Sequence, residues 1–153
     1  TLAMLQERFA YVFEPYPTPQ PQFWRPCLVP RLIDGPLALG GLNIQSFRQE
    51  HGRMPSLGFR FGPFAYSTDA KSMSEKAFGI LEGVDTWIVD ALSETPHPTH
   101  SHLEQTLEWI ERVRPRRAIL THLSHRMDYE ILRRKLPAGV EPGFDGMVIE
   151  IPE

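Results

Sequence analysis

The sequence has 153 residues, enough for one domain with a hydrophobic core and too few for two ordinary ones. Hydrophobic residues make up 41% of it and charged residues 23%, and the formal net charge of -3 argues against a broad basic face for nucleic acid. Its single cysteine, Cys27, excludes an internal disulfide and a thiolate metal site. The sequence predicts neither a membrane span nor a signal peptide, so we expect a cytoplasmic protein.

The first 26 residues are predicted to form a short helix and a proline-rich arm. Apolar residues from Leu2 to Phe9 have the spacing of a short amphipathic helix. The segment EPYPTPQPQFWRP, residues 14–26, favours extended backbone, because proline restricts φ and removes amide donors. We therefore expect residues 1–26 to be a helix and arm, and residues 27–153 to form one partial domain.

Short runs broken by glycine follow this arm and predict antiparallel strands or hairpins. They are CLVPRLI (27–33), LNIQSFRQEHG (42–52), SLGFRFG (56–62) and FAYSTDA (64–70).

After residue 70 the pattern alternates between helix and strand, which predicts an α/β region. Ser101 and Glu104 form a capping-box pattern at the start of one of the helices. A turn at Asp145-Gly146 precedes a last predicted strand. The expected helices are 72–83, 101–113 and 127–136, and the expected strands before that turn are 86–92 and 117–123.

Two apolar strands end in residues with reactive side chains. WIVDA and AILTH are typical of central strands covered on both faces, and they lead into Asp90 and His122. Ligands bind at the carboxyl ends of strands in open α/β sheets. A carboxylate there must be hydrogen-bonded, ion-paired or bound to a metal, because burying it otherwise is costly.

Other histidines and aspartates are open to two interpretations each. His51 fits a hairpin turn or a metal site, and Asp69 fits a turn, a helix cap or a metal site. His122 fits a core histidine or a ligand, with His125 and Asp128 either orienting it or starting the next helix.

The segment PHPTHSHLE is a rigid loop that runs into a helix. Its histidines are either solvated loop residues or part of a site. The helix N-terminus disfavours the cationic form of His100, which would suit it as a proton donor. We expect His102 to be a surface residue of the first helical turn.

Several segments together resemble a known family. QEHG, SLGFRFG, AYSTDA, IVDAL, PHPTHSHLEQTL, LTHLSHRMDYE and LPAGVEPGFDGMVIEI are similar, in this order, to the second half of metallo-β-lactamase-fold hydrolases. The resemblance is to the phosphoribosyl cyclic phosphodiesterase branch, which is related to the tRNA 3′-processing endonucleases. It runs from about residue 40 to the end, and it implies an α/β fold (α+β in some schemes), namely the C-terminal half of an αββα sandwich.

The resemblance also implies roles for individual residues. His51 and His122 would each bind one of two divalent metal ions, manganese or zinc, and Asp69 would bridge both. His100 would be the catalytic histidine that protonates the leaving group or holds the phosphate. Supporting roles are expected at Asp90, His97, His125, Asp128 and Asp145.

One motif of the family is missing from this sequence. The family's main metal motif, H-x-H-x-D-H, has no counterpart, and residues 1–50 contain no histidine. The resemblance therefore implies a truncated chain that supplies three of seven ligands and is inactive alone. Half of a sandwich exposes apolar surface, so we expect association with the missing N-terminal half or a homodimer.

For the intact protein, the resemblance implies a metal-dependent phosphodiesterase. A hydroxide activated by two metals would attack a small cyclic phosphodiester. Two alternatives remain open at this point. The chain is a noncatalytic, metal-free structural or binding domain, or the same fold acts on RNA or on a carboxylic ester.

Overall fold

The computed structural model describes residues 2–14 and 28–151, which fall into two compact units, Thr1–Asp34 and Gly35–Glu153. The first unit contains the helices α1 (Leu2–Arg8) and α2 (Ala10–Phe13), which agree with the helix predicted at the start. The proline-rich arm lies almost entirely outside the described residues. Within the described ranges, no helix is long and apolar enough to cross a membrane.

The strand predicted for residues 27–33 is wrong for the residues that are described. Residues 28–33 have no regular secondary structure, and Cys27 lies outside the described residues. The amide of Leu28 donates to Val12 O at 3.0 Å, and Pro30 has no amide to donate. The described residues of this unit include no strand with which an extended run could form a ladder.

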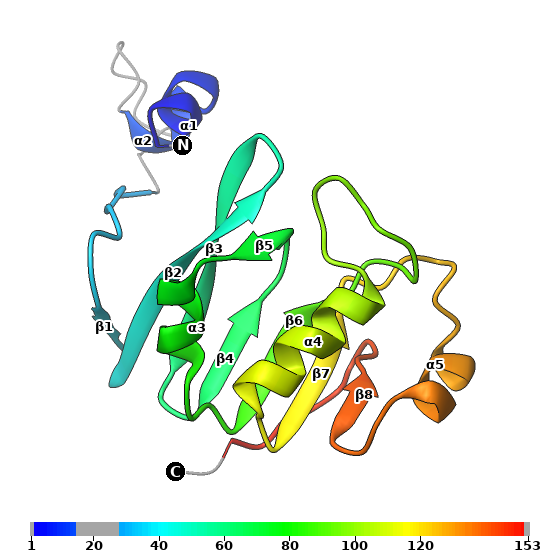
Figure 1. Cartoon of the computed structure of the whole chain (residues 1–153). Helices are drawn as coiled ribbons and strands as arrows, with labels where there is room; N and C mark the ends of the chain where they lie inside the picture. The colour runs from blue at the N-terminus through cyan, green and yellow to red at the C-terminus, as the bar shows by residue number, and fades with distance from the viewer. Residues whose placement is uncertain (1, 15–27, 152–153) are drawn as a thin grey trace. The chain divides into compact units, whose positions relative to one another are not determined.

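The second unit is built on one mixed sheet in the order β1-β2-β3-β4-β6-β7-β8, with β5 paired to β2 (Figure 1). β1 to β4 form antiparallel pairs, whereas β4, β6, β7 and β8 run parallel. The strands are β1 (Leu37–Leu39), β2 (Leu42–His51), β3 (Met54–Phe61), β4 (Phe64–Ser67), β5 (Ser72–Met73), β6 (Thr86–Asp90), β7 (Arg117–Thr121) and β8 (Val140–Pro142).

Helices form the crossovers between the parallel strands. α3 (Glu75–Leu81) joins β4 to β6, α4 (Leu103–Val113) joins β6 to β7, and α5 (Tyr129–Lys135) joins β7 to β8. Figure 1 shows α3 and α4 over the same face of the sheet. Strand side chains that alternate toward this face form the core together with residues of the two helices: Trp87, Val89, Ala118 and Leu120 from the strands, Leu81 from α3 and Trp109 from α4. The predicted α/β class is confirmed.

The burial of β6 and β7 explains why their sequences read as continuous apolar runs. Thr86, Trp87, Val89 and Asp90 are all buried, and only Ile88 is partly exposed. Parallel strands covered on both faces show this pattern instead of strict alternation.

The strand predicted after the Asp145-Gly146 turn does not form, because no described strand pairs with residues 147–151.

Candidate metal centre

The predicted site residues meet at one edge of the sheet because of how the strands run. β4, β6 and β7 are parallel, and β2 points the same way as β4 since two antiparallel pairs separate them. His51 ends β2, Asp69 follows β4, Asp90 ends β6 and His122 follows β7. The carboxyl ends of these strands therefore bring the four side chains to a common edge.

Asp69 lies between two imidazoles. Its Oδ1 atom is 3.7 Å from His51 Nε2 and 4.0 Å from His122 Nε2. His51, Asp69 and His100 offer ligand atoms that all lie within 4.8 Å of one another. Imidazole nitrogen and carboxylate oxygen suit zinc or manganese, so this donor set fits the expected metals. The assignment of His51, Asp69 and His122 as ligands stays a prediction.

Asp69 and His122 both adopt left-handed backbone conformations, with φ of 56° and 61°. Such conformations are unfavourable for residues other than glycine and cluster at functional sites, at a cost of about 1–3 kcal/mol each. Both residues sit where a parallel strand ends and the chain turns sharply. The turn directs each side chain into the space between the strand ends.

Buried hydrogen bonds hold the turn before and at Asp69. Gln49 is fully buried, and its Nε2 donates to Thr68 O at 2.9 Å and to Ser56 Oγ at 3.0 Å. The Ser56 hydroxyl in turn donates to Asp69 O at 2.7 Å. Sequence reasoning missed both supporting residues. The polar Gln49 on the buried face of an otherwise alternating strand was the available signal.

His100 is bound to Asp90 in the interior. His100 Nδ1 donates to Asp90 Oδ2 at 3.0 Å, and the same oxygen accepts the amide of Ala70 at 2.9 Å. With Nδ1–H committed to Asp90, Nε2 is the nitrogen left to face a substrate or a metal. This hydrogen bond fixes the orientation of the His100 ring, and the supporting role expected of Asp90 stays a prediction.

The loop that carries His100 is fixed at its end by backbone and hydroxyl groups. The Ser101 amide donates to Ala70 O at 2.6 Å, and its hydroxyl donates to Asp90 O at 2.7 Å. The capping box predicted for Ser101 and Glu104 is therefore wrong. α4 begins after His102, and the His102 side chain makes no capping hydrogen bond. The Ser101 hydroxyl does not cap the helix because it donates to Asp90 O at the end of β6.

His100 is surrounded by the other imidazoles of the site. Its ring centroid lies 4.6 Å from that of His51 and 4.6 Å from that of His122, with the latter pair stacked. The His97 ring is 5.2 Å away. Histidines from three separate segments thus contribute to one cluster, which no local sequence pattern could reveal.

His51 is oriented by the loop opposite it. Its Nδ1 donates to Thr99 O at 2.9 Å, which leaves Nε2 to face Asp69. Metal-binding histidines commonly use the second ring nitrogen in this way, and losing the partner typically lowers metal affinity about 10–100-fold. Thr99 was not predicted from the sequence.

We expect Gly52→Ala to weaken metal binding about tenfold or more through this contact. Gly52 has φ of 63°, and an added Cβ would lie 2.5 Å from Thr99 Cγ2, displacing the carbonyl that binds His51. The matched control is Gly62→Ala, which has φ of 59° and no atom within 4 Å of its Cβ. Metal titration of both variants checks this prediction, and equal affinities would contradict it.

Two of the expected supporting residues lie outside the cluster. Asp128 caps α5, with its Oδ1 accepting the Ile131 amide at 2.9 Å, which agrees with the interpretation as a helix start. His125 is exposed in the loop before α5. His97 is next to His100, and its Nδ1 accepts the Thr99 amide at 3.4 Å.

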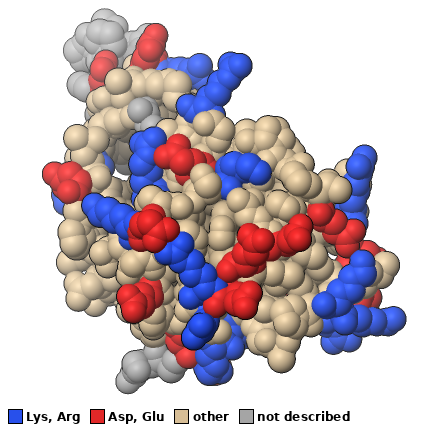
Figure 2. All heavy atoms as spheres, viewed as in Figure 1, with Lys and Arg blue, Asp and Glu red and all other residues tan. Residues whose placement is uncertain are grey.

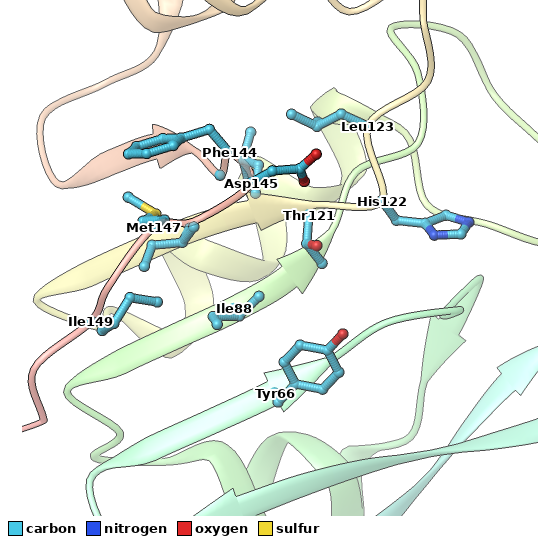
Figure 3. Close-up of a pocket in the computed structure, with 12 residues that line it drawn as sticks. Tyr66, Ile88, Thr121, His122, Leu123, Phe144, Asp145, Met147 and Ile149 are labelled. Carbon is cyan, nitrogen blue, oxygen red and sulfur yellow. The ribbon is translucent and has the colours of Figure 1, made fainter.

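A cavity of about 450 Å³ adjoins His122 on the sheet face opposite α3 and α4. Figure 3 shows the His122 ring at the opposite end of this cavity from Met147 and Ile149. Asp145 lines the same cavity as His122. Apolar side chains from β6, β7 and the C-terminal segment form most of the lining.

Burial raises the pKa of the Asp90 carboxyl above its ordinary value of 3.8, and the hydrogen bonds from Ala70 and His100 oppose this shift. A carboxyl whose pKa is raised on folding contributes stability that is fully present below its unfolded-state pKa. This contribution is lost as the pH rises through the folded-state value.

We therefore expect the stability of the parent protein, relative to Asp90→Asn, to decrease as the pH rises above 3.8. The asparagine cannot titrate, so the difference in free energy of unfolding isolates Asp90. Urea unfolding in the presence of a chelator, repeated across this pH range, measures the difference. A difference that grows with pH would contradict the prediction.

Comparisons with known proteins identify related sequences and folds. A crystal structure of a diphosphatase from the PhnP family is 30% identical with a TM-score of 0.83, covering 99% of this chain and 56% of that one. The short form of human tRNase Z is 22% identical with a TM-score of 0.58, covering 76% of this chain and 46% of that one. The metallo-β-lactamase-fold protein YhfI from Bacillus subtilis is 17% identical with a TM-score of 0.61, covering 74% and 52%. The last two support the fold alone.

Among curated proteins, an octanoyltransferase from Porphyromonas gingivalis is 29% identical over 154 residues. The match covers 99% of this chain and 31% of that protein. This chain therefore spans about a third of the curated relative and about half of the diphosphatase. The family model of the beta-lactamase superfamily domain matches residues 1–123. The chain belongs to the metallo-β-lactamase superfamily.

Proposed function

We propose that this chain contributes to a metal-dependent hydrolase that cleaves phosphodiesters, with a small cyclic phosphodiester as the preferred substrate. The observation that carries the proposal is the convergence of His51, Asp69 and His122 with the Asp90–His100 pair at one sheet edge. The diphosphatase relative, named for phosphorus chemistry, supports a phosphoryl substrate over a purely structural role.

Three of the residues present would bind metal, and a fourth would transfer a proton. His51, Asp69 and His122 would hold divalent metal, which supplies charge neutralisation and an activated water when bound. Asp69 lies between the two histidines and suits the bridging position. His100 would protonate the leaving oxygen, because Asp90 holds its Nδ1–H and keeps Nε2 available.

We also propose that further ligands come from another part of a longer protein. Among the described residues, His51, Asp69 and His100 have ligand atoms within 4.8 Å of one another. Even together with His122 they are too few donors for a pair of metals. Residues 1–50 contain no histidine to add to it. The proposed activity accordingly belongs to the full-length protein.

The proposal is tested by substrate choice in the full-length protein. Turnover of bis(p-nitrophenyl) phosphate should exceed turnover of p-nitrophenyl octanoate, and a chelator should abolish it. A diphosphate ester should be assayed beside these two, since the named diphosphatase makes that the nearest competing phosphoryl substrate. Activity on the carboxylic ester alone would reject the phosphodiesterase proposal.

The carboxylic ester remains a second candidate because of one observation. Nearly the whole chain aligns with part of a protein named for transfer of an octanoyl group. An acyl substrate would use the same metal ligands and would place its chain against apolar side chains. The same assay separates the two candidates, since the octanoyl ester tests this alternative directly.

A further inference from the structure

The two peptide groups on either side of Asp69 are both held by side chains of neighbouring strands. The peptide group before it carries Thr68 O, which accepts the side-chain amide of Gln49 at 2.9 Å. The peptide group after it carries Asp69 O, which accepts the Ser56 hydroxyl at 2.7 Å. The orientations of these two planes define φ and ψ of Asp69. Gln49 and Ser56 therefore fix the backbone conformation of this residue.

The second of these peptide groups is bound at both ends. Its carbonyl accepts the Ser56 hydroxyl, and its N–H, which belongs to Ala70, donates to Asp90 Oδ2 at 2.9 Å. Ser56 lies in β3 and Asp90 in β6, on opposite sides of β4. The paired bonds resist the rotation of this plane by which Asp69 would leave its left-handed conformation, with φ of 56°.

Gln49 uses Nε2 for both of its hydrogen bonds and leaves its own oxygen unpaired. The side chain is fully buried, and among the described residues Oε1 has no hydrogen-bond partner. An apolar residue would avoid this unfavourable burial. Gly58 of the neighbouring strand leaves room for the amide, since an added Cβ would lie 2.6 Å from Gln49 Oε1. The turn that Gln49 holds therefore explains this residue better than packing in the sheet does.

We propose that Gln49 and Ser56 are positioning residues of the metal centre, which keep the Asp69 carboxylate between its two histidines before metal binds. This inference rests on the proposed function, because it needs Asp69 to be a ligand. Its Oδ1 lies 3.7 Å from His51 Nε2 and 4.0 Å from His122 Nε2. A group that is already held in its binding geometry loses less conformational entropy on binding, which raises affinity.

Exposed charges do not contribute to this positioning. Figure 2 shows acidic and basic side chains interspersed over the face that carries α3 and α4. Salt screens such exposed groups, whereas the side chains of Gln49 and Ser56 are uncharged. The ratio of metal affinities between the parent and a Ser56 variant should therefore be the same at low and at high salt.

Ser56→Ala in the full-length protein tests the inference. It removes the hydroxyl that binds Asp69 O and leaves the bond from Gln49 to Thr68 O in place. Titration with Zn²⁺ against a competing chelator should show affinity about tenfold or more below that of the parent, since losing a group that orients a ligand typically costs about 10–100-fold. Gln49→Met has a side chain of similar length without the amide, and it should weaken Zn²⁺ binding further because both bonds are lost.

The matched control is Ser67→Ala. Ser67 lies in β4, and its hydroxyl accepts the Trp87 Nε1–H at 3.0 Å in the interior. The same substitution thus removes a buried hydrogen bond without affecting the peptide groups around Asp69. The Zn²⁺ affinity and the visible spectrum of the Co²⁺-loaded protein should match the parent in Ser67→Ala and change in Ser56→Ala. Urea unfolding with a chelator measures the stability that each variant loses.

The outcomes separate this inference from the proposed function. A parent without bound metal would overturn the proposed function, and this inference with it. A metal-binding parent whose Ser56→Ala and Gln49→Met variants keep the parent affinity would overturn the inference alone. Equal losses of affinity in Ser56→Ala and Ser67→Ala would also overturn it, because a general loss of stability would then explain both.

Discussion

Asp69→Ala and His122→Ala should each reduce metal-dependent turnover of the full-length protein about 10³-fold or more. Metal ions contribute several kcal/mol of charge stabilisation in such reactions, and each 1.4 kcal/mol is a factor of ten in rate. Asp69 faces both His51 and His122 through one oxygen, so its removal affects the whole donor set. Metal content, measured by elemental analysis after dialysis, should fall together with activity.

Matched controls come from the same region of the chain. Asp128→Ala removes an exposed aspartate that caps α5, so it should lower stability by about 1 kcal/mol and leave metal content unchanged. His125→Ala is the control for His122→Ala. Equal loss of metal in the control and site variants would refute the ligand assignment. It would also favour the supporting role that the resemblance implies for Asp128 and His125.

His100→Ala should lower kcat about 10²–10⁴-fold while the metal content stays the same. General acid catalysis is typically worth that much, and the bond from Nδ1 to Asp90 leaves one nitrogen for proton transfer. Single-turnover rates and elemental analysis on the same samples give both quantities.

His100 also offers a ligand atom within 4.8 Å of those of His51 and Asp69, so the experiment distinguishes two roles. Parallel loss of metal and rate would make His100 a ligand instead of the proton donor. Asp90→Asn should lower the rate in the same direction as His100→Ala but by less, since an amide oxygen can still accept from Nδ1. An unchanged rate in Asp90→Asn would show that Asp90 does not position His100.

The sequence predicted the parts of this fold that depend on local patterns. Continuous apolar runs located β6 and β7, because strands covered on both faces need apolar residues at every position. The reactive side chains at the ends of these two runs then identified Asp90 and His122 as candidate site residues. The helix over residues 103–113 followed from its apolar stripe, although its first residue did not.

The errors arose where nonlocal contacts decide the structure. Ser101 could cap a helix by its sequence pattern, yet the carbonyl of Asp90 offers its hydroxyl a better partner across the fold. Residues 147–151 have a strand-like sequence without a described strand to pair with. Ser56 and Thr99 support the site through contacts to residues distant in sequence, which no single-sequence pattern indicates.

We propose that the cluster around Asp69 is a metal centre of a phosphodiester hydrolase. Metal analysis of the full-length parent and of Asp69→Asn, combined with turnover of bis(p-nitrophenyl) phosphate, tests it most directly. We predict two divalent ions per parent chain with chelator-sensitive turnover, and loss of both in Asp69→Asn. A folded parent without metal and without turnover would contradict the claim and favour a noncatalytic domain.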